Sequence, residues 1–317
     1  MLRLFKIQNG LITKLNATGI KQALDIGSAD WIDVRDPDET ERALLHKLLR
    51  TAPPHGGEVE EIESSARYFV DEAGIHIHLL FLAQSEGRHA TTSVACILQS
   101  NRLITIRDTN LADFRLLRMR ARRGRLECQS PAELLVTLLD QKVENHADNL
   151  EDIHRRLEGV SYMVLEDENA ELEDAISQLA RLEDSNGKIR LCLMDTQRSI
   201  AFLQRHLRER PELQQTCIDI TRDIETLMSH TTFLFEKINF LMESTQGFIN
   251  IEQNQIIKIF SIAAVVFLPP TLIASIYGMN FQFMPELDEP WAYPTALGLM
   301  ILSGIAPYWI FKRKGWL

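Results

Sequence analysis

Two long stretches without a charged residue lie near the C-terminal end of this 317-residue chain. The first runs from Ile259 to Pro285 and the second from Pro290 to Phe311. About 20 consecutive apolar residues suffice for a helix to cross the hydrocarbon core of a bilayer. We therefore predict two transmembrane helices, over residues 256–277 and 291–311.

The net charge of the chain lies in the part that precedes these stretches. The formal charge is −10, and residues 250–317 contribute nothing to it because their acids and bases balance. A nucleic-acid-binding protein would need a basic surface, so we expect no nucleic-acid partner. The N-terminal segment lacks the continuous apolar core of a secretory signal, and we expect the C-terminal helices to direct membrane insertion.

Residues 1–130 have the pattern of a cytoplasmic α/β domain, and we predict a mixed, largely antiparallel sheet with helices packed against it. Asp36, Pro37 and Glu39 have the spacing of a helix start, with Asp36 as the N-cap of a capping box. The predicted strands are β-rich runs separated by turn-like segments: 31–34, 67–70, 75–83, 93–98 and 103–107.

Helical periodicity replaces the strand pattern after residue 130. Ser130, Pro131 and Glu133 are typical of a helix start, and we predict a long helical hairpin over residues 131–210, with its second helix at about 169–207. Pro211 begins a third helix. Its apolar positions recur at heptad spacing: Leu213, Cys217, Ile220, Ile224, Leu227, Thr231, Leu234, Ile238, Leu241, Thr245 and Phe248.

No loop signal separates this third helix from the first apolar stretch. A continuous helix from 211 to 277 would be roughly 100 Å long, with residues 211–255 as a stalk and the rest as a membrane span. Pro269 and Pro270 lie inside the span, where proline removes a backbone donor. A kink or a widened helix is expected there, with nearby helices or water serving the freed carbonyls.

The second span has aromatic residues at both edges, as interfacial belts do. Residues 312–317 follow as a basic tail that begins Lys312-Arg313-Lys314. Because positive charges favour the cytoplasmic side, we predict that both termini are cytoplasmic. Only residues 278–290 are then left as an external loop.

The segment Tyr277-Gly278-Met279-Asn280 stands at the end of the first span. In this position it resembles the signature of the CorA family of divalent-cation channels. The following segment, residues 284–287, and the basic tail also resemble that family, as does the order of acidic domain, stalk and two spans.

The resemblance implies a homopentamer in the bacterial inner membrane that takes up Mg²⁺, and also Co²⁺ and Ni²⁺, down the electrochemical gradient. The first spans would surround the pore, and Gly278, Met279 and Asn280 would form the selectivity filter. Mg²⁺ would be both the transported and the regulatory ion, bound between acidic cytoplasmic domains, with no other cofactor. Asp219 resembles one regulatory ligand, although no motif identifies its partner.

Magnesium gives up its water shell reluctantly, which favours a filter of neutral carbonyls that hold the hydrated ion weakly. Gly278 also permits a backbone turn at the end of the helix that a Cβ would hinder. Spacings of three and four from Asn280 place Asn254, Ile257, Ser261, Leu268, Thr271 and Leu272 along the pore, with Val265 or Ala264 between them and Phe260 facing either the pore or a neighbouring helix. Asn254 also matches a polar pore position of the family.

The same spacing continues into the stalk at Asn250 and Glu243, with Glu236 further down. Carboxylate rings there would concentrate cations on the path, although plain solvated stalk residues fit the same pattern. The external acids Glu286, Asp288 and Glu289 would attract cations at the mouth; the last two also fit ordinary loop polarity.

Other features have simpler explanations. His76 and His78 share a strand face but lack an obvious third metal ligand. The four cysteines have no metal or disulfide spacing, which indicates reduced, partly buried thiols. The arginine run 115–125 pairs with acids of the long helices or with anionic lipid headgroups in our interpretation.

We weighed three alternatives to a magnesium channel. A zinc, cobalt or nickel carrier of the same family would share the whole layout. A membrane-anchored coiled-coil scaffold would explain the stalk but not Asn280 or the double proline. A hydrolase has no supporting nucleophile–base pattern, and no Walker-type loop occurs, so we expect no enzymatic activity.

Overall fold

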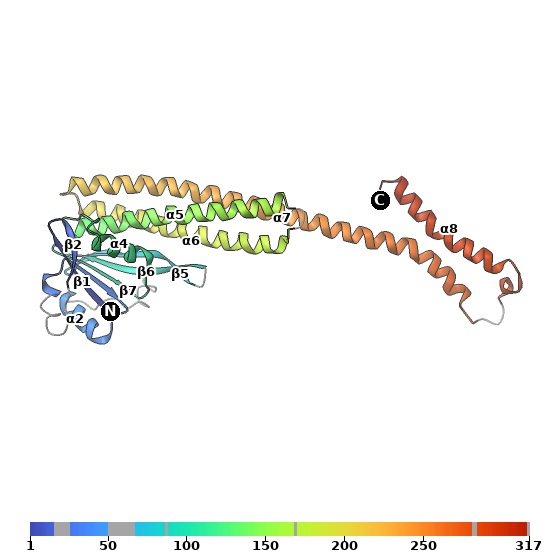
Figure 1. The fold of residues 1–317 in the computed structure, drawn as a ribbon, viewed down its shortest axis with the longest axis horizontal. Helices are drawn as coiled ribbons and strands as arrows, with labels where there is room; N and C mark the ends of the chain where they lie inside the picture. Colours follow the sequence, from blue (N-terminus) through green and yellow to red (C-terminus); the bar gives the residue numbers. More distant parts are fainter. Residues whose placement is uncertain (16–25, 50–66, 86–87, 168–169, 281–283, 316–317) are drawn as a thin grey trace. The chain divides into compact units, whose positions relative to one another are not determined.

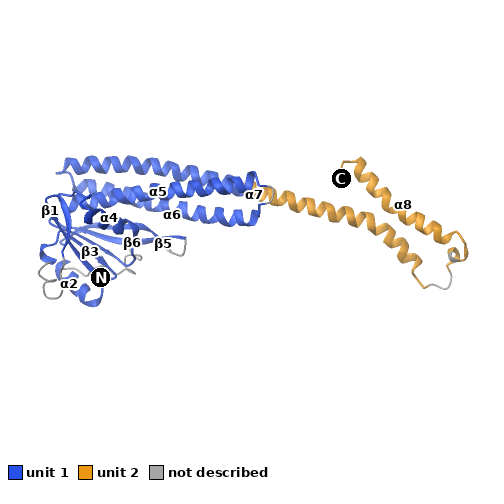
Figure 2. Cartoon of the chain, in the orientation of Figure 1, with its two compact units in different colours: residues 1–242 blue, residues 243–317 orange. Residues whose placement is uncertain are grey.

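The structure is a computed structural model that describes residues 1–15, 26–49, 67–85, 88–167, 170–280 and 284–315. The chain forms two compact units, Met1–Met242 and Glu243–Leu317 (Figure 2). The boundary between them falls within a single helix, α7 (Pro211–Tyr277). An acidic α+β part, long helices and two apolar C-terminal helices together confirm the predicted fold class.

Within the described residues, unit 1 contains a seven-stranded sheet of order β2-β1-β3-β7-β6-β5-β4 (Figure 1). Neighbouring strands are antiparallel except β3 and β7, which run parallel and pair Trp31 with Leu103. The prediction of a largely antiparallel sheet is confirmed. The strands are β1 (Leu2–Gln8), β2 (Leu11–Leu15), β3 (Trp31–Arg35), β4 (Tyr68–Asp71), β5 (Gly74–Ser85), β6 (Arg88–Leu98) and β7 (Leu103–Arg107).

The two faces of the sheet enter two separate hydrophobic cores. Successive side chains of a strand point to opposite faces, so Cys96 of β6 lies in the larger core and Ile97 in the smaller one. Helix α2 (Glu39–Leu49) packs on the smaller core, and α4 (Ala112–Arg122) packs on the larger core with the long helices. The sheet is therefore covered on both sides.

The predicted cap of α2 was wrong by two residues. The Asp38 carboxylate accepts a hydrogen bond from the Glu41 amide (2.8 Å), and the Glu41 carboxylate accepts one from the Asp38 amide (3.3 Å). This is the reciprocal pattern of a capping box, placed at 38 and 41 instead of 36 and 39. Asp36 has φ 45° and donates its amide to the Arg107 carbonyl, so its backbone belongs to the end of β3.

Two long helices, α5 (Pro131–Leu165) and α6 (Leu172–His206), follow α4. The Ser130 side chain accepts from the Glu133 amide and Pro131 is in the first turn, so the predicted start of α5 is confirmed. The predicted first residue of the second helix, Asn169, lies outside the described residues.

Helix α7 runs through 67 residues without a break, as predicted, and includes both prolines. In unit 1 its heptad residues pack against α5 and α6 and are buried, except Leu227, which is half-buried; Ile224, Leu234 and Ile238 are fully inaccessible. Phe248 belongs to unit 2, and its side chain is 40% exposed.

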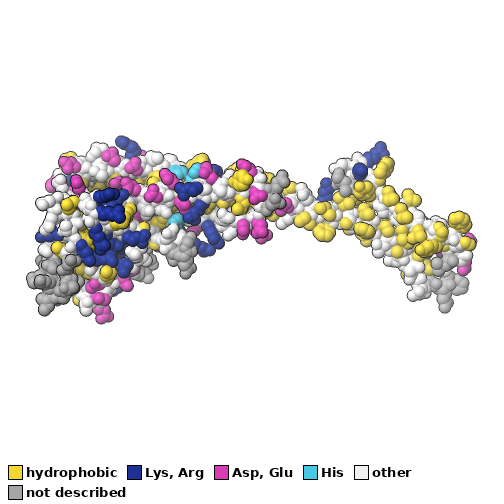
Figure 3. Space-filling model, in the orientation of Figure 1, with side chains coloured by type: hydrophobic (Ala, Val, Ile, Leu, Met, Phe, Trp, Pro, Cys, Tyr) yellow, Lys and Arg dark blue, Asp and Glu magenta, His cyan; other side chains and the backbone are white. Residues whose placement is uncertain are grey.

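Unit 2 contains the end of α7, a short 3-10 helix η1 (Pro285–Asp288) and α8 (Ala292–Arg313). The most apolar windows of α7 and α8 are long enough to cross a membrane, and only 0% and 6% of them are buried. Figure 3 shows hydrophobic side chains over unit 2, whereas unit 1 presents charges of both signs. Apolar helices that are unburied in their own chain fit lipid or other subunits better than a soluble core.

Candidate ion pathway

Helix α7 ends at the predicted filter. The Gly278 amide donates to the Ala274 carbonyl (2.9 Å) and the Met279 amide to the Ile276 carbonyl (3.2 Å). Gly278 does not have a positive φ. A Cβ on Gly278 would lie 3.1 Å from the Ala274 oxygen. Crowding of the last helical turn therefore favours glycine, in agreement with our prediction that a Cβ would hinder the turn at the end of this helix.

Met279 and Asn280 are exposed immediately after this turn. Their side chains are free to meet a hydrated ion or a neighbouring subunit, and the roles predicted for them stay predictions. The predicted external acids are exposed as well: Glu286 and Asp288 in η1, and Glu289 directly after it.

The predicted pore-lining residues are all exposed, although every side chain of α7 from residue 251 to 261 is exposed and only the later residues mark out one side. Leu268 and Leu272 are 66% and 62% exposed. Thr271 is also exposed, and its hydroxyl donates to the Phe267 carbonyl at 2.7 Å. The remaining exposed members of this predicted set are Asn254, Ile257 and Ser261, and the neighbouring Phe260, Ala264 and Val265 are exposed too.

From residue 262 to 273, the opposite side of α7 is half-buried. Its members include Ile262, Ala263, Val266, Pro270 and Ile273. A Cβ built on Gly304 of α8 would lie 3.5 Å from the Pro270 ring, which places α8 on this side. The sequence signal for that contact, a glycine within a predicted membrane helix, was missed.

The stalk has the same two-sided character. Glu236, Glu243 and Asn250 are exposed, whereas Leu241 and Thr245 are fully buried. At 3.6 residues per turn the first group lies roughly half a turn from the second. The predicted cation-path residues thus lie on the side that the chain's own helices do not use.

Asp219 is exposed on α7 and accepts a hydrogen bond from the Gln215 amide group at 3.1 Å. In the described ranges, no group of three or more His, Cys, Asp or Glu residues is arranged to hold a metal. Asp219 is therefore not part of a cluster of three or more such residues within the described part of one chain.

The other sequence features have structural partners in unit 1. The His76 imidazole lies 2.9 Å from the Asp71 carboxylate, and His78 is buried. Arg118 pairs with Asp33 at 2.9 Å and Arg120 with Glu144 of α5 at 3.5 Å. The interpretation that the arginine run pairs with acids of the long helices is confirmed for Arg120.

All four cysteines are free and buried, as expected. Burial raises the pKa of the Cys96 thiol to about 12 and that of Cys192 to about 11. A thiol must lose its proton to bind metal or react. These side chains are therefore inert parts of the core.

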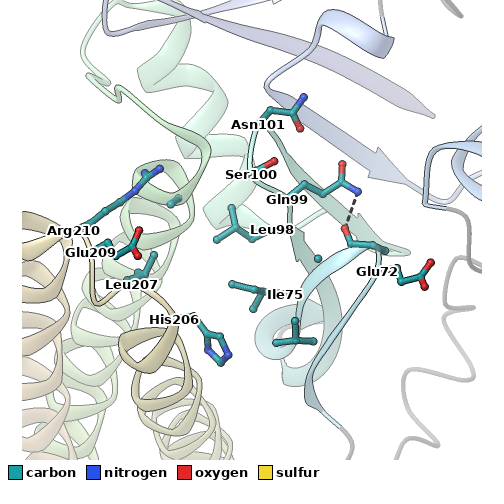
Figure 4. Close-up of a pocket in the computed structure, with 14 residues that line it drawn as sticks. Glu72, Ile75, Leu98, Gln99, Ser100, Asn101, His206, Leu207, Glu209 and Arg210 are labelled. Atoms are coloured by element: carbon teal, nitrogen blue, oxygen red, sulfur yellow. Dashed lines mark hydrogen bonds between the residues drawn. The ribbon is translucent and has the colours of Figure 1, made fainter.

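A pocket of 580 Å³ lies between the α6–α7 connection and two strand turns of unit 1 (Figure 4). Glu209 and Arg210 line one side and Gln99 the other, where its side chain donates to the Ala73 carbonyl at 2.7 Å. The lining mixes both charge signs and includes none of the residues predicted for ion passage. It is separate from the candidate pathway.

The chain is similar to proteins of known name over its full length. The model of the family described as "CorA-like Mg2+ transporter protein" matches residues 27–313. "Magnesium transport protein CorA" of Yersinia pseudotuberculosis and that of Escherichia coli K12 are each 46% identical over 319 residues, with 100% of both chains covered.

A solved structure has the same fold. It is "The complete structure of CorA magnesium transporter from Methanocaldococcus jannaschii", with a TM-score of 0.74, 20% identity, and 100% of this chain and 99% of that one covered. The family model covers the α+β unit from β3 onward, the 67-residue helix and both apolar segments described above. Because the family model matches most of the chain and the magnesium transport proteins are 46% identical over its full length, the chain belongs to the CorA-like Mg²⁺ transporter family.

Proposed function

We propose that this protein is a channel for Mg²⁺ uptake. The observation that carries the proposal is the exposed Gly278-Met279-Asn280 segment at the end of an unburied apolar helix. The 46% identity to magnesium transport proteins over the full length supports the same ion. No enzymatic step is part of the proposal.

Asn280 acts on the hydrated ion. Its side-chain carbonyl accepts hydrogen bonds from the water shell, so Mg²⁺ need not pay the large cost of dehydration. A neutral amide holds a divalent ion weakly enough for it to leave again, as conduction requires. Co²⁺ and Ni²⁺ carry similar water shells and also pass.

The driving force is the membrane potential together with the concentration gradient. Two charges that cross 100 mV correspond to roughly 4.6 kcal/mol. This energy is enough for uptake without a nucleotide.

The channel is a homopentamer in this proposal, with α7 around the pore. Support comes from the apolar surface that one chain leaves uncovered on α7, where Phe233 is 50% exposed and Phe240 is 58% exposed. Burial of such side chains between subunits is favourable by about 25 cal/mol per Å². The same arrangement would bring copies of Asn280 into one ring.

The membrane is the bacterial inner membrane, with both termini in the cytoplasm. Trp291 and Trp309 near the two ends of α8 are 76% and 60% exposed, as suits residues at a bilayer interface. The Arg313 guanidinium lies 5.5 Å from the Trp309 ring, next to the rest of the basic tail. That end of α8 faces the cytoplasm by the positive-inside rule.

Intracellular Mg²⁺ closes the channel by bridging acidic surfaces of neighbouring subunits. Asp219 is one candidate ligand, because it is exposed and belongs to no cluster of three or more potential ligands among the described residues of its own chain. Without bridging ions, like charges on adjacent subunits repel. Limited proteolysis with and without millimolar Mg²⁺ tests this. Protection by Mg²⁺ that weakens in Asp219→Asn supports the assignment, and equal digestion of the parent in both conditions refutes it.

Uptake of Mg²⁺ by reconstituted liposomes tests the main proposal. We expect wild-type protein to conduct and Asn280→Ala to lose most of the flux, while Asn101→Ala in the β6–β7 turn keeps it. A non-conducting scaffold gives no flux with any of the three. Equal flux from wild type and Asn280→Ala would remove Asn280 from the filter.

A flux series over Mg²⁺, Co²⁺, Ni²⁺ and Zn²⁺ separates the magnesium channel from a zinc carrier. A filter that contacts only the water shell passes the first three at comparable rates. A carrier that binds Zn²⁺ directly would favour zinc by a large factor and transport little Mg²⁺.

A further inference from the structure

Gly304 of α8 lies against the part of α7 that contains the double proline. A Cβ on Gly304 would lie 3.5 Å from Cγ of Pro270 and 3.6 Å from the carbonyl oxygen of Val266. These are ordinary van der Waals distances, so a methyl group just fits. Anything larger meets a closed ring and a backbone atom, neither of which can rotate away.

The Val266 carbonyl is the one that Pro270 leaves without its helical donor. In an α-helix the carbonyl of residue 266 accepts from the amide of residue 270, and proline has no amide hydrogen. Helices in lipid tolerate such a defect where a neighbouring helix covers it. Gly304 is the residue that lets α8 come close enough to do so.

This contact lies behind the predicted pore face. At 3.6 residues per turn, Val266 and Pro270 point roughly opposite to Ser261 and Leu268. The exposures agree, because Val266 and Pro270 are half-buried whereas Ser261 and Leu268 are exposed. A push on α7 from α8 at this point therefore moves the helix toward its exposed side.

We propose that Gly304 is a positioning residue for ion permeation, acting through Pro270. Its small size lets α7 lean back against α8 at the proline break and so keeps the path wide enough for a hydrated ion. A larger side chain at 304 displaces α7 toward the path and narrows it near Leu268. The proposal rests on the proposed function, since it assigns the exposed side of α7 to the ion path.

A size series at residue 304 tests the proposal in full-length protein reconstituted in liposomes. Gly304→Ala should conduct like wild type, and Gly304→Val and Gly304→Leu should lose Mg²⁺ flux in that order. We expect a fall of about tenfold for leucine, equivalent to about 1.4 kcal/mol in the barrier. Gly298→Leu is the matched control. Gly298 is on the same helix, α8, and a Cβ there would have no neighbouring atom within 4 Å.

A double-mutant cycle with Pro270→Ala tests whether the effect passes through the proline. Alanine removes the ring and returns an amide donor to the Val266 carbonyl, so Gly304→Leu should cost less flux in that background. General damage to α8 would cost the same in both backgrounds, because independent effects add. Size-exclusion chromatography of each variant checks assembly; if the leucine variant does not assemble, valine serves in the cycle.

Failure of the proposed function and failure of the role of Gly304 give different results. Absence of Mg²⁺ flux in wild type overturns the proposed function. A conducting wild type overturns the role of Gly304 if flux does not fall with size at 304, if Gly298→Leu falls equally, or if the cycle is additive.

Discussion

The ammonium nitrogen of Lys142 lies 4.7 Å from the centroid of the Phe81 ring, between α5 and β5. The lysine is fully buried, and its nitrogen has no hydrogen-bond partner in the described residues. Burial lowers the pKa of Lys142. A cation–π contact returns only about 0.5–2 kcal/mol, whereas the effective penalty for burying a charge amounts to several kcal/mol.

Replacing this lysine by methionine should therefore stabilise unit 1. Lys142→Met keeps most of the side-chain volume and removes a buried ammonium group that has no hydrogen-bond partner in the described residues. We therefore expect the free energy of unfolding to rise by about 1–3 kcal/mol. Chemical denaturation followed by tryptophan fluorescence measures the change.

Lys188→Met serves as the control for that substitution. Its nitrogen donates to the His89 carbonyl (2.8 Å) and to Asp184 (2.6 Å), so the same change should bring no gain. A loss of stability in Lys142→Met would mean that the ring contact outweighs the cost of burial.

Acid should destabilise the protein through its buried histidines. Burial lowers the pKa of His146 to about 3 and of His78 to about 4, from 6.5. Below about pH 6.5 the unfolded chain binds protons that the folded chain does not. The free energy of unfolding therefore decreases as the pH is lowered. Each histidine contributes up to about 1.4 kcal/mol per pH unit. Asp113, whose pKa burial raises to about 6, acts in the opposite sense between about pH 6 and 4.

The slope of unfolding free energy against pH isolates one histidine. His146→Gln should reduce the slope between pH 6 and 4.5, measured by urea denaturation, whereas His46→Gln on the exposed side of α2 should leave it unchanged. An unchanged slope in His146→Gln would contradict the assignment.

Neutralising the external acids should slow uptake only at low salt. The triple variant Glu286→Gln, Asp288→Asn, Glu289→Gln loses local attraction for cations, and we expect a several-fold lower initial rate. The difference should disappear at about 1 M salt, where the screening length falls to about 3 Å. Glu173→Gln with Asp174→Asn, at the start of α6, should not change the rate. A salt-independent deficit would indicate a direct ligand role instead.

Alanine at Gly278 should disturb the filter. Its Cβ would be 3.1 Å from the Ala274 carbonyl, so the last turn of α7 must shift by a few tenths of an ångström. A small misplacement at a functional site is costly, and we expect a roughly tenfold loss of Mg²⁺ flux. Gly298→Ala in α8 adds the same methyl group in open space and should conduct normally. Full flux in Gly278→Ala would show that the turn adapts freely.

The elements with strong local signals were predictable. Ser130, Pro131 and Glu133 gave the start of α5, and the heptads of α7 gave its continuity. The cap of α2 was not predictable, because Asp36 and Asp38 are each followed three residues later by a glutamate, as a capping box requires. The hydrogen bond from the Asp36 amide to the Arg107 carbonyl decides between them. Strands β1 and β2 were also missed.

The candidate site was predictable as a motif but not as a contact. The segment ending at Asn280 predicts the filter position, and helical spacing predicts one side of α7. Spacing within α7 cannot say which residue of α8 approaches it, so the Gly304–Pro270 contact required the structure. The sequence predicted that a Cβ at Gly278 would hinder the turn, but the atom that crowds it, the Ala274 carbonyl oxygen, required the structure.

The parallel pairing of β3 with β7 sets an order of events during synthesis. The indole of Trp31 donates a hydrogen bond to the hydroxyl of Thr105, 74 positions further along the chain. Trp31 therefore leaves the ribosome long before its partner does. At 5–20 residues per second, the edge of β3 that pairs with β7 has no partner strand for roughly 4–15 seconds. The nascent sheet therefore needs protection from other chains over that interval, before either membrane helix has been translated.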